Sequence, residues 1–451
     1  MIRPLRAAGR LAFAGLLLAV GSAATAAQKP HPQPAAKPGL DLTPVKPETV
    51  GFSSERLERL HTLMQWSVDH KQVAGVVTLL ARHGKVVDFR AYGELDMASH
   101  TAMARDTIFR DYSMTKPVTA VAMMILYEQG KWLPSDPIAK YIPEFKNLKV
   151  YKGVDDDGRM ILEAPEHPPT MRELMSHTAG FTYGFFGDTP VDKMYRDSNL
   201  FASKDLHEFI EKLAKIPLTY QPGHGWTYSV SMDVEGYIVE KLSGKSLPEF
   251  YRDQIYTPLG MRDAGFFVPE AKRARFATNY WVDAQTGALT STPGGSLPQR
   301  DYSTQPTMPS GGGGMVSTTE DYYRFAQMLG NGGELNGKRI LAPASVRLMS
   351  SNHVPVELLD GHHGIGSQIL RPGFGYGYNC AVVFDPGAAN LPEGKGTFFW
   401  DGAAGTWFWV DPANDVVFVG MIQRMNAGPA SENLQYESRS VVYGALVDPA
   451  K

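Results

Sequence analysis

The sequence is poor in cysteine: Cys380 is the only one among 451 residues. A chain with one cysteine forms no internal disulfide, so we expect its stability to come from an apolar core. Cys380 lies in the apolar segment 378–384, where we expect a small, buried strand residue rather than a catalytic thiol.

The sequence also lacks an excess of positive charge. The 44 Lys and Arg residues face 47 Asp and Glu residues, which leaves a formal net charge of -3, and no basic run occurs. Nucleic acids and acidic membrane surfaces attract proteins mainly through clustered positive charge. We therefore expect neither of them as a partner of this chain.

Several catalytic and cofactor motifs are missing as well. Neither a Gly-x-Ser-x-Gly elbow nor a His-Glu-x-x-His zinc motif occurs. Residues 244–246, Gly-Lys-Ser, look like the end of a phosphate-binding loop, but Val239 stands where its first glycine belongs. His362 and His363 have no third ligand nearby, so we expect an exposed loop there rather than a metal site. We expect no metal and no cofactor.

The apolar run near the N-terminus, residues 11–20, is shorter than the roughly 20 residues that a membrane-spanning helix needs. Arginines precede this run and small residues follow it, which is the arrangement of a secretory signal peptide. We expect residues 1–27 to be a cleaved signal peptide and residues 28–47, rich in proline, to be a tether. The mature protein is then periplasmic or secreted and has no stable membrane anchor.

Strand patterns occupy the two ends of the remaining chain, and helical patterns fill its middle. The predicted strands are 74–82, 86–92, 376–384, 396–400, 405–410 and 416–422. The predicted helices are 53–70, 113–129, 171–177, 204–214, 232–242, 247–256, 319–329 and 431–446. We expect one domain over 48–451 with an α/β (α+β) fold. Its antiparallel sheet comes from both chain ends (48–95 and 370–451) and is flanked by helices, with a mainly helical region over 110–350.

Ser113 and Lys116 form the only Ser-x-x-Lys of the chain, at the start of a predicted helix that ends before Gly130. Residues three apart share one helical face, so the hydroxyl and the amine are expected to point the same way. The helix is apolar almost all round, which predicts burial. Because burial disfavours the ammonium form, Lys116 is suited to accept a proton and to activate Ser113.

Residues 112–116 also fit the Tyr-x-x-x-Lys pattern of short-chain dehydrogenases. No glycine-rich turn between a strand and a helix precedes them, although a dinucleotide site requires one. An exported protein would also lack a ready supply of nicotinamide cofactor. The dehydrogenase interpretation is therefore the weaker one.

Three more segments carry candidate chemistry. Tyr228 follows the turn residues 221–223 and precedes a helix; it is a packing residue unless a neighbouring cation favours its phenolate form. The stretch 400–405 is Trp-Asp-Gly-Ala-Ala-Gly, with residue 403 between its two glycines. It is either a tight turn or an edge whose backbone N–H groups face a substrate carbonyl. The run 310–314, Ser-Gly-Gly-Gly-Gly, predicts a turn where the backbone bends or approaches another group closely.

Together these motifs resemble the serine β-lactamase-like hydrolases: class C β-lactamases, D-Ala-D-Ala carboxypeptidases and, closest, the esterases of family VIII. The resemblance starts near residue 50 and rests on five stretches in family order: 112–116, 170–180, 221–230, 256–261 and 313–318. It implies a β-lactamase/transpeptidase-like fold with Ser113 as the acylated nucleophile. It also implies that Lys116 and Tyr228 relay protons, either one being the general base, and that the backbone N–H groups of Ser113 and Ala403 form the oxyanion hole.

Two positions depart from the β-lactamase pattern. Val230 replaces the asparagine of Tyr-x-Asn, and Trp400 begins Trp-Asp-Gly402 where those enzymes carry Lys-Thr-Gly. The missing lysine would have met a substrate carboxylate, a bond that contributes about 1.5 to 3 kcal/mol. Its loss predicts a roughly ten- to hundredfold lower turnover of β-lactams. We expect Tyr112, Val230, Trp400 and Gly402 to contact substrate and to favour neutral esters.

The function expected from the sequence is that of an exported serine carboxylesterase acting on short-chain or aromatic esters through an acyl-enzyme. One alternative keeps this mechanism and changes the substrate to a β-lactam or a D-amino acid peptide. Another is a non-catalytic binding protein that retains the fold. In each case the expected partner is a small-molecule ester or amide.

Overall fold

The computed structural model describes residues 40–283, 285–293, 300–361, 369–425 and 433–449. The chain divides into two units, Met1–Lys37 and Pro38–Lys451, and every described residue belongs to the second. The expected signal peptide, most of the expected tether and the pair His362-His363 lie outside the described residues. No helix in the described ranges is both long enough and apolar enough to cross a membrane.

An eight-stranded antiparallel sheet joins the two ends of the chain, with the strand order β12-β13-β14-β15-β16-β1-β2-β3. Its strands are β1 (Gly75–Arg82), β2 (Lys85–Asp96), β3 (Thr101–Ala102), β12 (Phe374–Tyr376), β13 (Ala381–Val383), β14 (Thr397–Asp401), β15 (Trp407–Asp411) and β16 (Val416–Met421). The junction lies between β1 and β16, where Val77 is opposite Met421 and Arg82 is opposite Val416. The expected sheet from both chain ends is confirmed.

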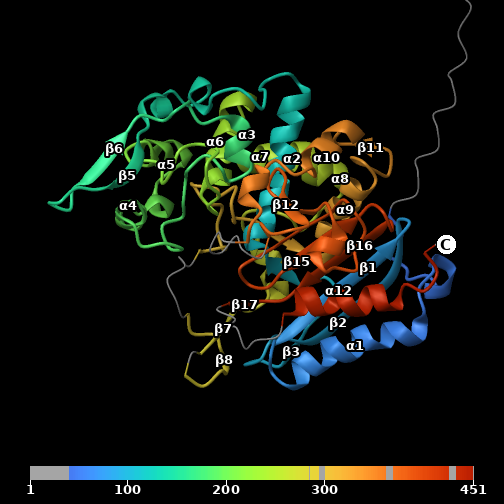
Figure 1. Ribbon diagram of the computed structural model, residues 1–451. Helices are drawn as coiled ribbons and strands as arrows, with labels where there is room; N and C mark the ends of the chain where they lie inside the picture. The colour runs from blue at the N-terminus through green and yellow to red at the C-terminus, as the bar shows by residue number, and fades with distance from the viewer. Residues whose placement is uncertain (1–39, 284, 294–299, 362–368, 426–432, 450–451) are drawn as a thin grey trace, which may run out of the picture. The chain divides into compact units, whose positions relative to one another are not determined.

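Helices cover both faces of this sheet. Tyr443 of α12 (Leu434–Ala445) stacks on Trp409, whereas α9 (Thr319–Gly330) meets the neighbouring strand residue Val410 at Gly330. Successive strand residues point to opposite faces, so α12 and α9 cover opposite faces. Figure 1 shows α1 (Ser54–Asp69) beside α12. With both faces covered, β1, β15 and β16 are buried along their whole lengths and read as continuous apolar runs.

The middle of the chain is mainly helical, as expected. Its helices are α2 (Thr115–Glu128), α3 (Met171–Met175), α4 (Pro190–Ser198), α5 (Leu206–Leu213), α6 (Ser231–Ser243), α7 (Leu247–Tyr251), α8 (Thr257–Leu259) and α10 (Pro343–Met349). α2 is buried from Thr115 to Leu126 and packs against α6, α7 and α10. The core helix α2 therefore carries Lys116 of the Ser-x-x-Lys motif into the protein interior, directly after the turn that holds Ser113.

Some predicted elements differ from the structure. The predicted strand 376–384 is a hairpin: β12 ends at Tyr376 and β13 begins at Ala381, with Asn379 in the left-handed region at φ 61°. Cys380 is buried as expected but lies in the turn, not in a strand, and burial raises the pKa of its thiol to about 12. The predicted helix 247–256 is α7 followed by a π-helical turn, Arg252–Tyr256. Gly377 and Asn379 are turn residues within the first interruption, whereas no residue of the π-helical turn, Arg-Asp-Gln-Ile-Tyr, marks its start.

The middle of the chain also contains strands, although we expected none there. They are β4 (Ile108–Arg110), β5 (Val150–Val154), β6 (Met160–Glu163), β7 (Tyr280–Val282), β8 (Leu289–Thr290), β9 (Val316–Thr318), β10 (Glu334–Leu335) and β11 (Lys338–Arg339). The pair β4–β9 borders both halves of the site described next, since it precedes Ser113 and follows the glycine run 310–314. Segments of two to five residues are too short for a period-two pattern to identify them.

Candidate active site

Ser113 lies in a single 3-10 turn, Tyr112–Met114, directly before α2. Tyr112 has a φ of 45°, a region that non-glycine residues rarely adopt and that is common at functional turns. Two hydrogen bonds hold this turn in place: Thr406 donates to the Asp111 carbonyl (3.1 Å), and Tyr322 donates to the Met114 carbonyl (2.8 Å). This held turn presents Ser113 to a cavity of about 220 Å³.

Lys116 contacts Ser113 as the spacing predicts. Its Nζ donates to Ser113 Oγ at 3.0 Å and to the Gly312 carbonyl at 2.7 Å, and the side chain is fully buried. Burial lowers the pKa of the Lys116 amine from 10.5 to about 7, against the opposing fields of Asp233, Asp401 and Glu235. Near neutral pH a substantial part of the population is therefore uncharged and able to accept a proton.

The phenol ring of Tyr228 lies beside the Lys116 amine, with Nζ 4.5 Å from the ring centroid. The ring is enclosed by His177, Tyr183 and Trp400, whose centroids lie 4.9, 5.4 and 5.6 Å away. Burial raises the pKa of the Tyr228 phenol far above its usual range, although the nearby Ser113 hydroxyl and Trp400 indole oppose the shift. Tyr228 thus keeps its proton at neutral pH and can donate a hydrogen bond there.

The Ala403 amide is the structure's candidate for a second oxyanion donor. Ala403 lies in the turn between β14 and β15, where Gly402 N–H donates to the Thr406 carbonyl and Gly405 N–H donates to the Gly402 carbonyl, both at 2.8 Å. Within the described ranges no acceptor takes the Ala403 N–H, and Ala403 lines the cavity together with Ser113. This N–H is therefore available to a ligand oxygen.

Gly402 supports this arrangement without lining the cavity. A Cβ atom at this position would lie 2.3 Å from the Asp111 carbonyl oxygen, which belongs to the turn that carries Ser113. Only glycine allows the β14–β15 turn and the nucleophile turn to approach this closely. Gly402 therefore sets the spacing between Ser113 and Ala403.

The other predicted substrate contacts occupy different positions. Tyr112 lines the cavity, and its hydroxyl accepts a hydrogen bond from Asn279 at 3.1 Å. Val230 is fully buried at the start of α6 and does not line the cavity. Trp400 is buried against Tyr228 and Tyr376 and does not line it either. Trp400 therefore acts on the site through the Tyr228 ring, and direct substrate contact by Val230 or Trp400 stays a prediction.

The glycine run 310–314 does approach other groups closely, as its composition predicts. A Cβ at Gly311 would lie 2.3 Å from the Met232 carbonyl oxygen of α6. Asp233 holds the run from behind, because its Oδ1 accepts from the Ser310 hydroxyl (2.5 Å) and the Gly312 amide (3.3 Å). Since the Gly312 carbonyl accepts from Lys116, the buried Asp233 positions the lysine through the glycine run.

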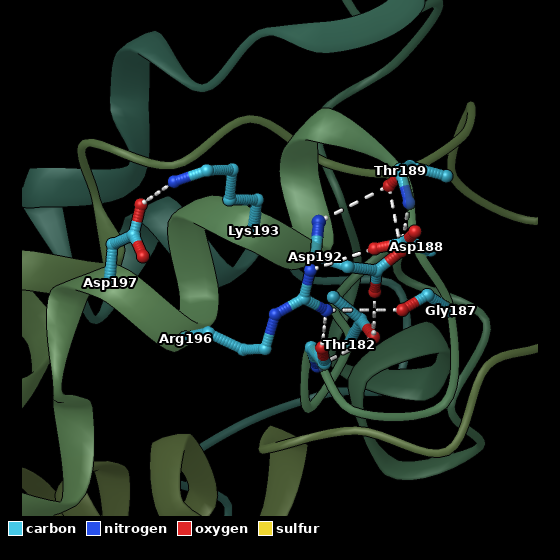
Figure 2. Close-up of polar contacts among 9 residues, drawn as sticks. Thr182, Gly187, Asp188, Thr189, Asp192, Lys193, Arg196 and Asp197 are labelled. Carbon is cyan, nitrogen blue, oxygen red and sulfur yellow. Dashed lines mark hydrogen bonds and ion pairs between the residues drawn. The ribbon is translucent and has the colours of Figure 1, made fainter.

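An aromatic wall of the cavity, not predicted from the sequence, is formed by Tyr183, Phe185, Phe186 and Phe201. Three of these rings belong to the loop 182–189, which precedes α4. Figure 2 shows the polar contacts that hold this loop: Thr182 and Thr189 donate to Asp192, and Arg196 donates to carbonyls of the loop. The Arg196 guanidinium reaches the Gly184 carbonyl at 2.5 Å and the Gly187 carbonyl at 3.1 Å. The sequence signal is the pair of phenylalanines between Gly184 and Gly187, followed by a Thr-x-x-Asp cap.

Two further cavity residues, Arg300 and Tyr302, were also missed. They precede the glycine run in sequence, in a segment with no helical or strand periodicity. Nothing in the sequence indicated their approach to Ser113. Within the described ranges, no group of three or more His, Cys, Asp or Glu residues is arranged to hold a metal ion.

Comparisons with known proteins agree with this fold. A family model described as Beta-lactamase matches residues 60–441. The chain is 35% identical to Protein Rv1367c of Mycobacterium tuberculosis (strain ATCC 25618 / H37Rv), over 78% of this chain and 86% of that protein. It is 31% identical to Esterase EstB of Burkholderia gladioli, over 79% of this chain and 87% of that protein.

Among solved structures, the chain resembles EstCE1, described as a hydrolase with promiscuous acyltransferase activity. The TM-score is 0.71 at 28% identity, and the match covers 86% of this chain and 98% of that one. The chain belongs to the Beta-lactamase family. With its esterase relatives, this membership makes it a serine hydrolase, and the family resemblance drawn from the motifs is confirmed.

Proposed function

We propose that this serine hydrolase is a carboxylesterase that cleaves short-chain or aromatic esters through an acyl-enzyme on Ser113. The observation that carries the proposal is the direct contact, 3.0 Å, between Ser113 Oγ and the buried amine of Lys116. The aromatic wall and the cavity of about 220 Å³ support small or aromatic substrates. The esterase named among its relatives, EstB, agrees with this class of substrate.

In the proposed acylation step, neutral Lys116 takes the proton of Ser113 Oγ as this oxygen attacks the ester carbonyl carbon. Lys116 is preferred over Tyr228 as the base because burial lowers the pKa of the amine and raises that of the phenol. The carbonyl oxygen becomes an oxyanion and accepts hydrogen bonds from the N–H groups of Ser113 and Ala403.

The oxyanion then reforms the carbonyl, and the bond to the alcohol oxygen breaks. In our proposal Tyr228 gives its proton to the leaving oxygen and regains one from the Lys116 ammonium group. Deacylation repeats these steps with water: Lys116 takes a proton from the water as its oxygen attacks the acyl carbon, and Ser113 leaves with a proton returned to Oγ. Each turnover ends with Lys116 neutral and Tyr228 protonated.

Replacement of Ser113 tests the proposal. We expect Ser113→Ala to abolish hydrolysis of 4-nitrophenyl butyrate, whereas Ser440→Ala on the exposed side of α12 keeps it. A fluorophosphonate probe should label the unmodified protein at Ser113, as mass spectrometry of the peptides can establish. Undiminished turnover by Ser113→Ala would overturn the assignment, and an unlabelled, inactive protein would support the non-catalytic alternative.

The choice between esters and β-lactams needs a separate comparison on one preparation. We expect kcat/KM for 4-nitrophenyl butyrate to exceed that for nitrocefin, because β14 presents Trp400 where β-lactamases present a lysine. A higher value for nitrocefin would reverse the order of the two substrate classes while leaving the Ser113 mechanism intact.

A further inference from the structure

A second cavity, of about 320 Å³, adjoins the one that holds Ser113. Tyr112, Arg300 and Tyr302 line both cavities. We call the second one the annex, and its own lining includes Arg110, Thr278, Asn279 and Ser291. The annex is thus polar, in contrast to the aromatic wall on the other part of the site, and it carries two guanidinium groups.

Among the described residues, neither guanidinium has a carboxylate partner. Arg300 is half-buried and forms no hydrogen bond or ion pair with any described residue. Arg110 donates to the Ala277 carbonyl (2.7 Å) and the Gln423 side chain (3.3 Å), both uncharged. Its guanidinium carbon lies over the Phe276 ring, 3.9 Å from the ring centroid. Burial lowers the pKa of Arg110, which shows that its charge is poorly solvated.

The acidic groups around the annex do not neutralise these two charges. Burial raises the pKa of Asp111 to about 8, so this carboxyl is mostly protonated at neutral pH. Asp96 accepts from the Thr278 and Ser99 hydroxyls and forms no ion pair with a described residue. Burial raises the pKa of Asp233, against the opposing effects of Ser310 and Arg300, and this carboxyl accepts from Ser310 and Gly312 and makes no ion pair with Arg300.

Two cations that share a cavity without a counter-charge are costly, because each loses hydration and repels the other. Guanidinium groups match the planar, two-oxygen geometry of a carboxylate and bind it through paired hydrogen bonds. We propose that Arg110 and Arg300 form an anion subsite in the annex, and that this subsite binds the carboxylate of an ester substrate whose carbonyl lies at Ser113. This inference rests on the esterase function proposed above and narrows its substrate class.

The anion subsite would also take over the role of the lysine that β-lactamases carry at the position of Trp400, namely binding a substrate carboxylate. In this chain β14 offers an indole at Trp400, so a substrate carboxylate finds no cation there. Arg300 supplies a cation from the segment that precedes the glycine run. An acidic ester would then bind with its carboxylate in the annex rather than at the β14 position where β-lactamases carry the lysine.

Matched substrate pairs test the anion subsite. One pair differs in the acyl half: 4-nitrophenyl hydrogen succinate and the neutral 4-nitrophenyl butyrate. The other differs in the leaving group: 4-acetoxybenzoate and the neutral 4-acetoxybenzamide. For at least one pair we expect the ratio of kcat/KM, acid over neutral, to fall about ten- to a hundredfold in Arg300→Met. We expect Arg300→Lys to keep part of this preference, and Arg347→Met on the exposed side of α10 to keep all of it.

A binding measurement separates failure of this inference from failure of the proposed function. Calorimetry on the Ser113→Ala protein should show tighter binding of benzoate than of benzamide, and Arg300→Met in that background should remove the difference. An unchanged ratio in Arg300→Met, an equal loss for both members of each pair, or equal binding of benzoate and benzamide would overturn the subsite. Selective benzoate binding by a protein without esterase activity would instead refute the proposed function and leave the subsite standing.

Discussion

The pH dependence of ester hydrolysis reports directly on the buried amine of Lys116. Burial brings the pKa of this amine from 10.5 to about 7, and only the neutral form accepts the Ser113 proton in the proposed mechanism. The sign follows from the lowered pKa of a cation: activity is present above that pKa and is lost as the pH falls through it. We expect kcat/KM to be constant above about pH 8 and half of its maximum near pH 7. Below pH 7 it should fall about tenfold for each pH unit.

The assay is the initial rate of 4-nitrophenyl butyrate hydrolysis between about pH 5 and 9 at constant ionic strength. Following the reaction at the isosbestic wavelength of nitrophenol removes the titration of the product from the signal. kcat/KM is the proper quantity because it reports ionisations of the free enzyme, and this neutral ester does not ionise. Lys116→Arg is the matched variant, since a guanidinium stays protonated at every pH used and should be inactive.

Two results would refute this reasoning. If kcat/KM rose only above about pH 9, either Lys116 would have an ordinary pKa or the Tyr228 phenolate would be the base. Full activity of Lys116→Arg with native circular dichroism would remove the lysine from the proton path altogether.

Three other variants test the supports of the site. Gly402→Ala should destabilise the protein by about 1 to 3 kcal/mol and lower kcat, because its Cβ would lie 2.3 Å from a backbone oxygen; Gly444→Ala, with open space around it, should do neither in thermal melts and kinetics. Arg196→Ala should raise KM for aromatic esters several-fold by loosening the aromatic wall, and an unchanged KM would count against that wall as a substrate contact. Burial raises the pKa of Glu235 to about 8, so its ionisation opposes folding and stability falls as the pH rises from about 4 to 8. Glu235→Gln should flatten this dependence in urea unfolding, and an equally steep fall in the variant would contradict the shift.

Long regular segments of the fold could be predicted from the sequence, and short or interrupted ones could not. β16 is an apolar run of six residues, β1 is a mainly apolar segment of eight, and α1 has a serine cap and a regular apolar face. The segment 376–384 is predicted as one strand because aromatic and apolar residues flank its turn, although Gly377 and Asn379 are turn residues. Its hairpin depends on pairing with β14, a contact between distant residues that no local pattern encodes.

The sequence by itself determined the pair Ser113–Lys116, because a spacing of three on a helix brings two side chains together whatever the rest of the chain does. Only the tertiary structure decided what this pair can do. The burial that lowers the pKa of Lys116 comes from α6 and the glycine run, which follow it by more than a hundred residues. The Ala403 amide and the Arg300 guanidinium likewise reach the site from distant turns, and desolvation and charge depend on such neighbours in space rather than on neighbours in sequence.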